Sequence, residues 1–196
     1  MTQQHSGIMS VMVSSLRFSI VVFGGFGLLY CWGLTQLAQQ LWPAQASGSV
    51  IVEQGKVIGS RWVGQPVESP RYFIGRPSAS AFDPMAMAGS NLAHSNPELA
   101  SRLAQREASL RNRMGLGTDV QIPSDLLTQS GSGNDPHISP AAAHLQVAAV
   151  ARARGVSQQV VRQLVDQAIE PPQWGILGNP RVNVLELNRT LDDLVR

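Results

Sequence analysis

Residues 18–37 read FSIVVFGGFGLLYCWGLTQL and carry no charged side chain. At about 1.5 Å rise per residue, a helix of this length spans roughly 30 Å, the thickness of the hydrocarbon core of a bilayer. Trp32 and Trp42 lie toward its far end, where indole rings favour the membrane interface. Pro43 follows and is expected to end the helix. The stretch therefore predicts one transmembrane helix over residues 18–40.

Charge sets the expected orientation of this helix. Arg17 is the only Lys, Arg, Asp or Glu before the span, and the next charged residue is Glu53. Because cytoplasmic flanks of membrane helices carry an excess of Lys and Arg, residues 1–17 are expected in the cytoplasm. Residues 41–49 are then a linker, and residues 50–196 form an extracytoplasmic domain.

A cleaved signal peptide is the competing interpretation of the N-terminal segment. Ala44-Gln45-Ala46 has the small-x-small form of a cleavage site. The uncharged run is longer than the apolar core of about 7–15 residues that is typical of signal peptides, which favours a permanent anchor. Whether the site is ever cut stays open, and either interpretation exports the domain.

The predicted anchor also has a candidate contact face. Gly24, Gly27, Cys31 and Thr35 are small and follow helical spacing. Small residues let membrane helices approach closely, so this face is a candidate for packing on a partner helix. Gly is also common in membrane helices in general, and that alternative remains open.

Composition limits what the domain can bind. Of the 15 Lys and Arg, all but Arg17 lie after the anchor, beside all 13 Asp and Glu, so there is no basic stripe. Nucleic-acid binding needs clustered positive charge and is not expected. Cys31 is the only cysteine, which leaves no internal disulfide and no cysteine zinc site.

The domain mixes short strands with helices. Residues 50–52 and 56–58 flank Gln54-Gly55 and predict a β-hairpin, and a further strand is expected over residues 61–67. Residues 70–95 are rich in Gly, Pro and Ser and predict an irregular but ordered loop. Residues 122–128 are expected to be a strand or an extended approach to the next loop.

Three capping signals predict helix starts, at Asn96-Pro97, Ser139-Pro140 and Ser157. A short strand and a terminal helix are expected after Pro171-Pro172. Strands and helices do not alternate regularly. The sequence therefore predicts an α+β fold, with one N-terminal transmembrane helix and a single small domain of a few short strands and about four helices.

The stretch QSGSGNDPHIS, residues 129–139, holds the residue types of catalysis within one loop. Members of a Ser/His/Asp triad normally come from separate parts of a fold, and the GxSxG pattern is absent, so an independent exported hydrolase is only a remote alternative. Gln129, Gly131 and Gly133 could offer backbone amides to a nucleotide, but there is no GxxxxGK[ST] motif. The alternative is a rigid turn, with positive φ at both glycines and Asp135 capping nearby amides.

Several polar, Gly-containing clusters resemble this loop, and together they predict an ordered recognition surface. A metal site at His94, His137 and His144 is not expected, because their neighbours supply no carboxylate at ligand spacing. No catalytic residue is assigned. The candidate recognition residues are Arg76, Pro77, Ser78, Gly89, Ser90, Asn91, Ser130, Gly131, Ser132, Gly133, Asp135 and His137.

Five motifs stand in the order of one family: YFIGRPSA from Tyr72, GSNL from Gly89, SGSG from Ser130, DPHISP from Asp135 and RVNVLELN from Arg181. With the anchor, they make the whole chain resemble the C subunit of the Kdp potassium-transporting P-type ATPase of bacteria. Asn134 departs from that pattern, since the family usually has an apolar residue there.

The resemblance implies a non-catalytic subunit of an ATP-driven, high-affinity potassium importer in the bacterial inner membrane. The implied partners are a channel-like potassium-binding subunit, the P-type ATPase subunit and a small membrane peptide, with ATP and potassium handled by the complex. The chain lacks the DKTGT phosphorylation motif of the ATPase subunit. Roles in assembly, stability and regulation are expected. The alternative proposed for the family is a catalytic chaperone that raises ATP affinity through residues 129–133.

Overall fold

The computed structural model describes residues 2–194 and divides into two compact units that meet between Ser49 and Val50. Met1, Val195 and Arg196, the ends of the predicted cytoplasmic segment and of the predicted domain, lie outside the described residues. The two units are described separately below.

The N-terminal unit is a nearly continuous helix. It consists of α1 (Thr2–Val22), η1 (Phe23–Tyr30) and α2 (Cys31–Leu41), followed by the one-turn helix α3 (Pro43–Ala46). Within the described residues, one helix is long and apolar enough to cross a membrane, over Gly7–Leu41. The break falls at Trp42, whose φ of −137° is not helical, because the residue before a proline disfavours the α conformation.

The predicted contact face of this helix crosses a change in helix type. Gly24 and Gly27 lie in η1, which is π-helical, whereas Cys31 and Thr35 lie in the α-helical turn that follows. A π-helix is wider than an α-helix, so the first two residues do not keep the α-helical spacing assumed from sequence. Space beside both glycines is open, with only the ring of Phe23 in van der Waals reach of Gly27.

The domain begins with the predicted hairpin. Strands β1 (Val50–Glu53) and β2 (Lys56–Ser60) pair antiparallel, with a bulge opposite Ile51 and Val52. Gln54 and Gly55 form the turn, both with positive φ. The pairing confirms the sequence-based hairpin.

A second sheet has three very short strands, of which only the one after Pro171-Pro172 was predicted. β3 (His137–Ile138) and β4 (Ile169–Glu170) both pair antiparallel with β5 (Arg181–Asn183), so the order is β3-β5-β4 and β5 confirms the predicted short strand. Strands of two or three residues carry too few side chains for the alternation that identifies a strand in sequence. The sheet joins the segment at β3 to the C-terminal segments at β4 and β5.

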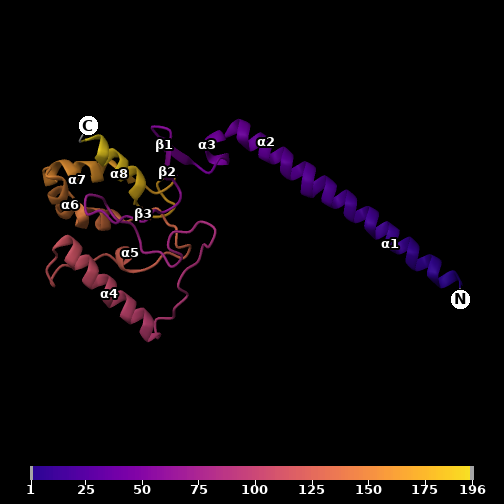
Figure 1. The fold of residues 1–196 in the computed structure, drawn as a ribbon, viewed down its shortest axis with the longest axis horizontal. Helices are drawn as coiled ribbons and strands as arrows, with labels where there is room; N and C mark the ends of the chain where they lie inside the picture. The colour runs from indigo at the N-terminus through magenta and orange to yellow at the C-terminus, as the bar shows by residue number, and fades with distance from the viewer. Residues whose placement is uncertain (1, 195–196) are drawn as a thin grey trace. The chain divides into compact units, whose positions relative to one another are not determined.

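The domain also contains helices α4 to α8, which are labelled in Figure 1. They are α4 (Pro97–Met114), α5 (Ser124–Leu127), α6 (Pro140–Arg154), α7 (Gln158–Gln167) and α8 (Val184–Asp193). The predicted caps are confirmed, since the side chains of Asn96, Ser139 and Ser157 each accept a backbone N–H two or three residues later. The α+β prediction is therefore correct.

Two local predictions were wrong. Residues 61–67 form no strand and run as an irregular segment. Residues 122–128 are not extended throughout, because Ser124–Leu127 makes one helical turn that buries Leu126 completely. In both places tertiary contacts outweigh the local apolar pattern.

The core forms where α6 contacts α4 and α7, and where α7 contacts α8. Its largest fully buried apolar side chains are Phe73, Leu110, Leu126, Leu187 and Leu191. Phe73 is the unusual member, because it comes from a segment without regular secondary structure.

Two buried amide side chains hold that segment in place. Asn188 of α8 accepts the Phe73 N–H at 2.8 Å and donates to the Phe73 carbonyl at 2.9 Å. Gln146 of α6 accepts the Ile74 N–H at 2.8 Å and donates to the Ile74 carbonyl at 3.1 Å. The amides thus replace a neighbouring strand, which satisfies backbone groups that would otherwise be buried without partners.

The Gln146→Leu variant is expected to unfold more easily. The substitution keeps the side-chain volume roughly but leaves the N–H and carbonyl of Ile74 unpaired, at about 1–3 kcal/mol for each buried group. Gln159→Leu, on an exposed position of α7, should change stability by less than about 0.5 kcal/mol. Urea unfolding of the full chain in detergent measures the stability of both variants. Equal stability of the two variants would contradict the proposed role of Gln146 in holding residues 73 and 74.

Candidate functional site

The recognition residues predicted from sequence come from two segments that meet at the start of β3, residues 76–91 and residues 129–137. These two segments are called the loop pair below. Arg76 donates from Nη1 to Oδ2 of Asp135 at 3.2 Å and from Nη2 to the carbonyl of Gln129 at 3.2 Å. These contacts join residues more than fifty positions apart in the chain. Arg76 can make them because the amide anchors at Phe73 and Ile74 fix the segment that precedes it.

Asp135 also binds the residues that follow it. Its Oδ1 accepts the His137 backbone N–H at 3.0 Å, and Nδ1 of His137 lies 3.5 Å from the same oxygen. Burial by itself raises the pKa of the Asp135 carboxyl, but the hydrogen bonds from His137 and the Arg76 guanidinium outweigh it, so the pKa is lowered overall. The predicted capping role of Asp135 is therefore confirmed for the amide of His137.

Gly133 lies at the closest approach of the two loops. A Cβ atom there would come within 2.5 Å of Ser80 Oγ and 2.8 Å of the Ala88 carbonyl oxygen, and its φ of 73° is left-handed. Gly131 has no positive φ, contrary to the sequence-based prediction, and the space beside its Cα is open. Only the second glycine of the pair is therefore required by the turn.

Further contacts join the other predicted clusters. A Cβ on Gly89 would lie 3.1 Å from the Gly131 carbonyl oxygen, which places these two motifs side by side. Pro77 and Ser90 line one groove together with Gln129. Asn91 adopts a left-handed φ of 52° on the exposed end of its loop. The structure thus brings together most of the residues that the motifs selected.

Sequence reasoning missed two residues that complete the site. The N–H of Gly64 donates to the Asn134 carbonyl at 2.8 Å, and a Cβ on Gly64 would lie 2.9 Å from the Asp135 carbonyl oxygen. The Asn134 side chain donates to the Asp83 carbonyl at 3.1 Å. An isolated glycine in an apolar run was the only available signal for the close approach at Gly64.

Buried polar atoms without a protein partner concentrate here. Within residues 2–194, the atoms of this kind are Arg76 Nε, Ser130 Oγ, Asn134 Oδ1 and His137 Nε2. Buried polar groups are normally hydrogen-bonded, and exceptions often mark functional places. Their clustering in one loop pair supports this region as the candidate site.

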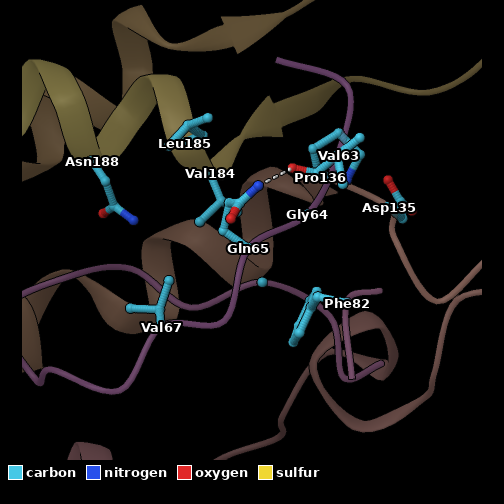
Figure 2. A pocket seen from close by; sticks show the side chains of 11 residues that line it. Val63, Gly64, Gln65, Val67, Phe82, Asp135, Pro136, Val184, Leu185 and Asn188 are labelled. Carbon is cyan, nitrogen blue, oxygen red and sulfur yellow. Dashed lines mark hydrogen bonds between the residues drawn. The ribbon is translucent and has the colours of Figure 1, made fainter. Parts of the chain in front are cut away.

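Besides the groove at Pro77 and Ser90, other hollows adjoin the loop pair, and two of them are described here. Figure 2 shows the first, a cavity of about 30 Å³ between Gly64, Phe82, Pro136 and Val184, with Gln65 donating to the Val63 carbonyl at its edge. That volume suits one or two water molecules and not a metabolite. The second is an open groove of about 580 Å³, and its polar lining includes Arg76, Asp125, Asp135, His137 and Arg181.

The residues considered for catalysis or nucleotide binding make contacts inside the loop. Ser132 Oγ accepts the Asn134 N–H at 3.1 Å, and Ser130 is buried. The Gly133 N–H is directed to the Ser130 carbonyl at 3.3 Å. Of the three residues considered for a nucleotide, Gly133 thus has its amide engaged within the turn.

The histidines considered for a metal site have other neighbours. His137 faces Asp135, and its ring centroid lies 6.0 Å from that of Trp62 with the two planes tilted by 50°, whereas His144 pairs with Asp166 of α7 at 3.2 Å. His94 is exposed at the end of the long loop. Across residues 7–194, whose side chains the structure describes, no three His, Cys, Asp or Glu side chains gather as a metal centre would require.

One helix of membrane-spanning length followed by an α+β domain with a locked pair of polar loops is consistent with a single-pass membrane protein. The family model described as K+-transporting ATPase, c chain (KdpC) matches residues 12–193. The chain therefore belongs to the KdpC family.

Named relatives agree along nearly the whole chain. A potassium-transporting ATPase KdpC subunit of Shewanella putrefaciens is 50% identical over 94% of this chain and 92% of its own length. The subunit of the same name from Xanthomonas campestris is 49% identical over 91% and 85%, and that from Methylococcus capsulatus 50% over 86% and 90%. The resemblance inferred from the five motifs is thus confirmed.

The two loop glycines should respond differently to a methyl group. Gly133→Ala is expected to destabilise the chain by about 1–2 kcal/mol from the left-handed φ, and more from the clash with Ser80 and Ala88. Gly131→Ala, with open space and ordinary φ, is the matched control and should be nearly neutral. Thermal unfolding and proteolysis of the loop at residues 79–95 report the difference, and equal sensitivity of the two variants would refute the loop packing.

Proposed function

We propose that this chain is a non-catalytic accessory subunit of an ATP-driven, high-affinity potassium import complex, needed for its assembly, stability and regulation. Membership of the KdpC family carries the assignment to a potassium pump. The partners are the channel-like potassium-binding subunit, the P-type ATPase subunit and a small membrane peptide.

The loop pair supports a recognition role for the domain. Arg76, Asp135 and Gln129 fix the two loops to each other, and Gly133 fits against Ser78 and Ser80 without room for a side chain. A surface that is ordered before binding loses less conformational entropy when a partner docks. We assign it to the extracytoplasmic face of the potassium-binding subunit.

The anchor supports the membrane location. The helix over Gly7–Leu41 has no buried side chain within its own unit, as expected of a segment that is covered by lipid and partner helices. We place the N-terminus in the cytoplasm and the domain outside, in the bacterial inner membrane, because Arg17 directly precedes the uncharged stretch of residues 18–37 and the next charged residue is Glu53. Gly24, Gly27, Cys31 and Thr35 remain the proposed face for a partner helix.

Deletion of residues 1–40 should abolish copurification of this chain with the pump. The deleted segment supplies the helix that we propose packs on the partner membrane helices. The matched control replaces the same segment with an unrelated single membrane span, which restores tethering but not the specific helix contacts. Copurification and potassium-dependent ATPase activity are the measurements. Full activity of the pump with the truncated, soluble chain would disprove the anchoring role.

The catalytic-chaperone alternative requires the domain to meet cytoplasmic ATP, so topology separates the two functions. A Ser132→Cys variant in a Cys31→Ser background carries one thiol, at an exposed loop position. We expect an impermeant maleimide to label it in intact cells from outside. Labelling only after the cells are opened would refute the proposed orientation and favour the nucleotide model.

A further inference from the structure

The most exposed large apolar side chains outside the long N-terminal helix include those at the tip of the β4–β5 connection. Residues 171–180 read PPQWGILGNP and contain no charged residue. Trp174 is 81% exposed and Ile176 80% exposed, and Leu177 is half exposed. Isolated apolar residues on a surface are ordinary, but an uncharged loop with three neighbouring ones at its tip is typical of an interaction site.

This apolar tip, residues 174–177, is held in a fixed shape. Gln173 and Leu177 exchange backbone hydrogen bonds of 2.9 and 3.0 Å across it, and the Gly175 N–H donates to the Pro172 carbonyl at 2.9 Å. Trp174 adopts a left-handed φ of 54°. A bulky side chain is disfavoured in that conformation, and such strain is found where a particular side chain is needed at that point.

Charges at the base of the loop are already paired. Arg181 Nε lies 3.0 Å from Oε2 of Glu170, and Arg61 Nη2 lies 3.3 Å from Oε1 of the same residue. Loops that bind lipid surfaces usually combine apolar tips with Lys or Arg for anionic headgroups. Here the nearby cations are engaged by carboxylates, which favours an apolar site on a protein over a lipid surface.

The connection that carries the apolar tip ends at the candidate site. Asn179, Pro180 and Arg181, at the end of this connection, line the open groove together with Arg76 and His137. A partner that enters the groove therefore contacts the same chain segment that presents the tip.

We propose that the apolar tip, with Trp174 as its anchor, inserts into an apolar pocket on the extracytoplasmic surface of a partner protein subunit. This inference rests on the proposed function, since it requires the chain to be part of the complex. Buried tryptophans dominate many protein interfaces, and a tip ordered before binding adds little entropic penalty.

Site-specific labelling tests the proposal in the intact complex. In the Cys31→Ser background, the Trp174→Cys variant should react quickly with a fluorescent maleimide when this chain is alone in detergent. In the assembled pump the reaction should slow about tenfold or more. The Gln159→Cys variant, at an exposed position of α7 outside both loops of the candidate site, is the matched control and should react equally in both states.

Brominated lipids then separate a protein pocket from a membrane surface. The proposal stands if two results are obtained together. The thiol at position 174 reacts slowly in the complex, and the fluorescence of the label that does attach there is not quenched by brominated lipid in nanodiscs. Quenching by the lipid, or equal reactivity with and without the pump, would overturn it. If the unlabelled wild-type chain itself fails to copurify with the pump, the proposed function fails, and that result is recognised before any label is added.

A second variant guards against simple misfolding. Trp174→Gly removes the indole but suits the left-handed φ, so the chain should be at least as stable as wild type in thermal unfolding. It should nevertheless dissociate from the solubilised complex about tenfold faster or more. Unchanged dissociation would show that Trp174 is not an interface anchor.

Discussion

The bidentate hydrogen bonding of Phe73 and Ile74 by two buried amides is the constraint on which this domain depends. Gln146 and Asn188 come from different helices, and each satisfies both backbone groups of one residue. Other side chains hold the same segment from outside the core, since Arg154 donates to the Arg71 carbonyl and Arg113 to the carbonyls of Glu68 and Ser69. A chain segment without secondary structure is thereby positioned as firmly as a strand.

The candidate site follows from that constraint. Once residues 73 and 74 are fixed, Arg76 reaches Asp135, and Ser78 packs against Gly133. The charges, glycines and hydroxyls that resemble catalytic or phosphate-binding elements then become the parts of a rigid polar surface. The end of the β4–β5 connection lines the groove of this surface, and the same connection exposes Trp174, so one chain segment joins a preformed polar groove to an apolar anchor. That combination is common in protein interfaces, where an apolar centre is surrounded by polar contacts.

The parts of this arrangement that depend on neighbouring residues could be predicted from sequence, and the parts that depend on distant residues or on very short strands could not. The caps at Asn96, Ser139 and Ser157 were predictable because a cap depends on side chains within three residues. The sheet formed by β3, β4 and β5 was not, because strands of two or three residues have no periodicity to recognise. The motifs selected most of the site, but Gly64 and the loop at Trp174 were missed. The uncharged run between Pro171 and Pro180 was a usable signal for the latter.

The sequence by itself determined the long apolar N-terminal helix, the helix ends and the family. These depend on length, apolar content and the order of short motifs, all of which are properties of neighbouring residues. Only the tertiary structure decided which loops meet and which of Gly131 and Gly133 requires a left-handed conformation. Those outcomes depend on contacts between residues more than fifty positions apart, such as Arg76 with Asp135, and no local pattern encodes such a distance.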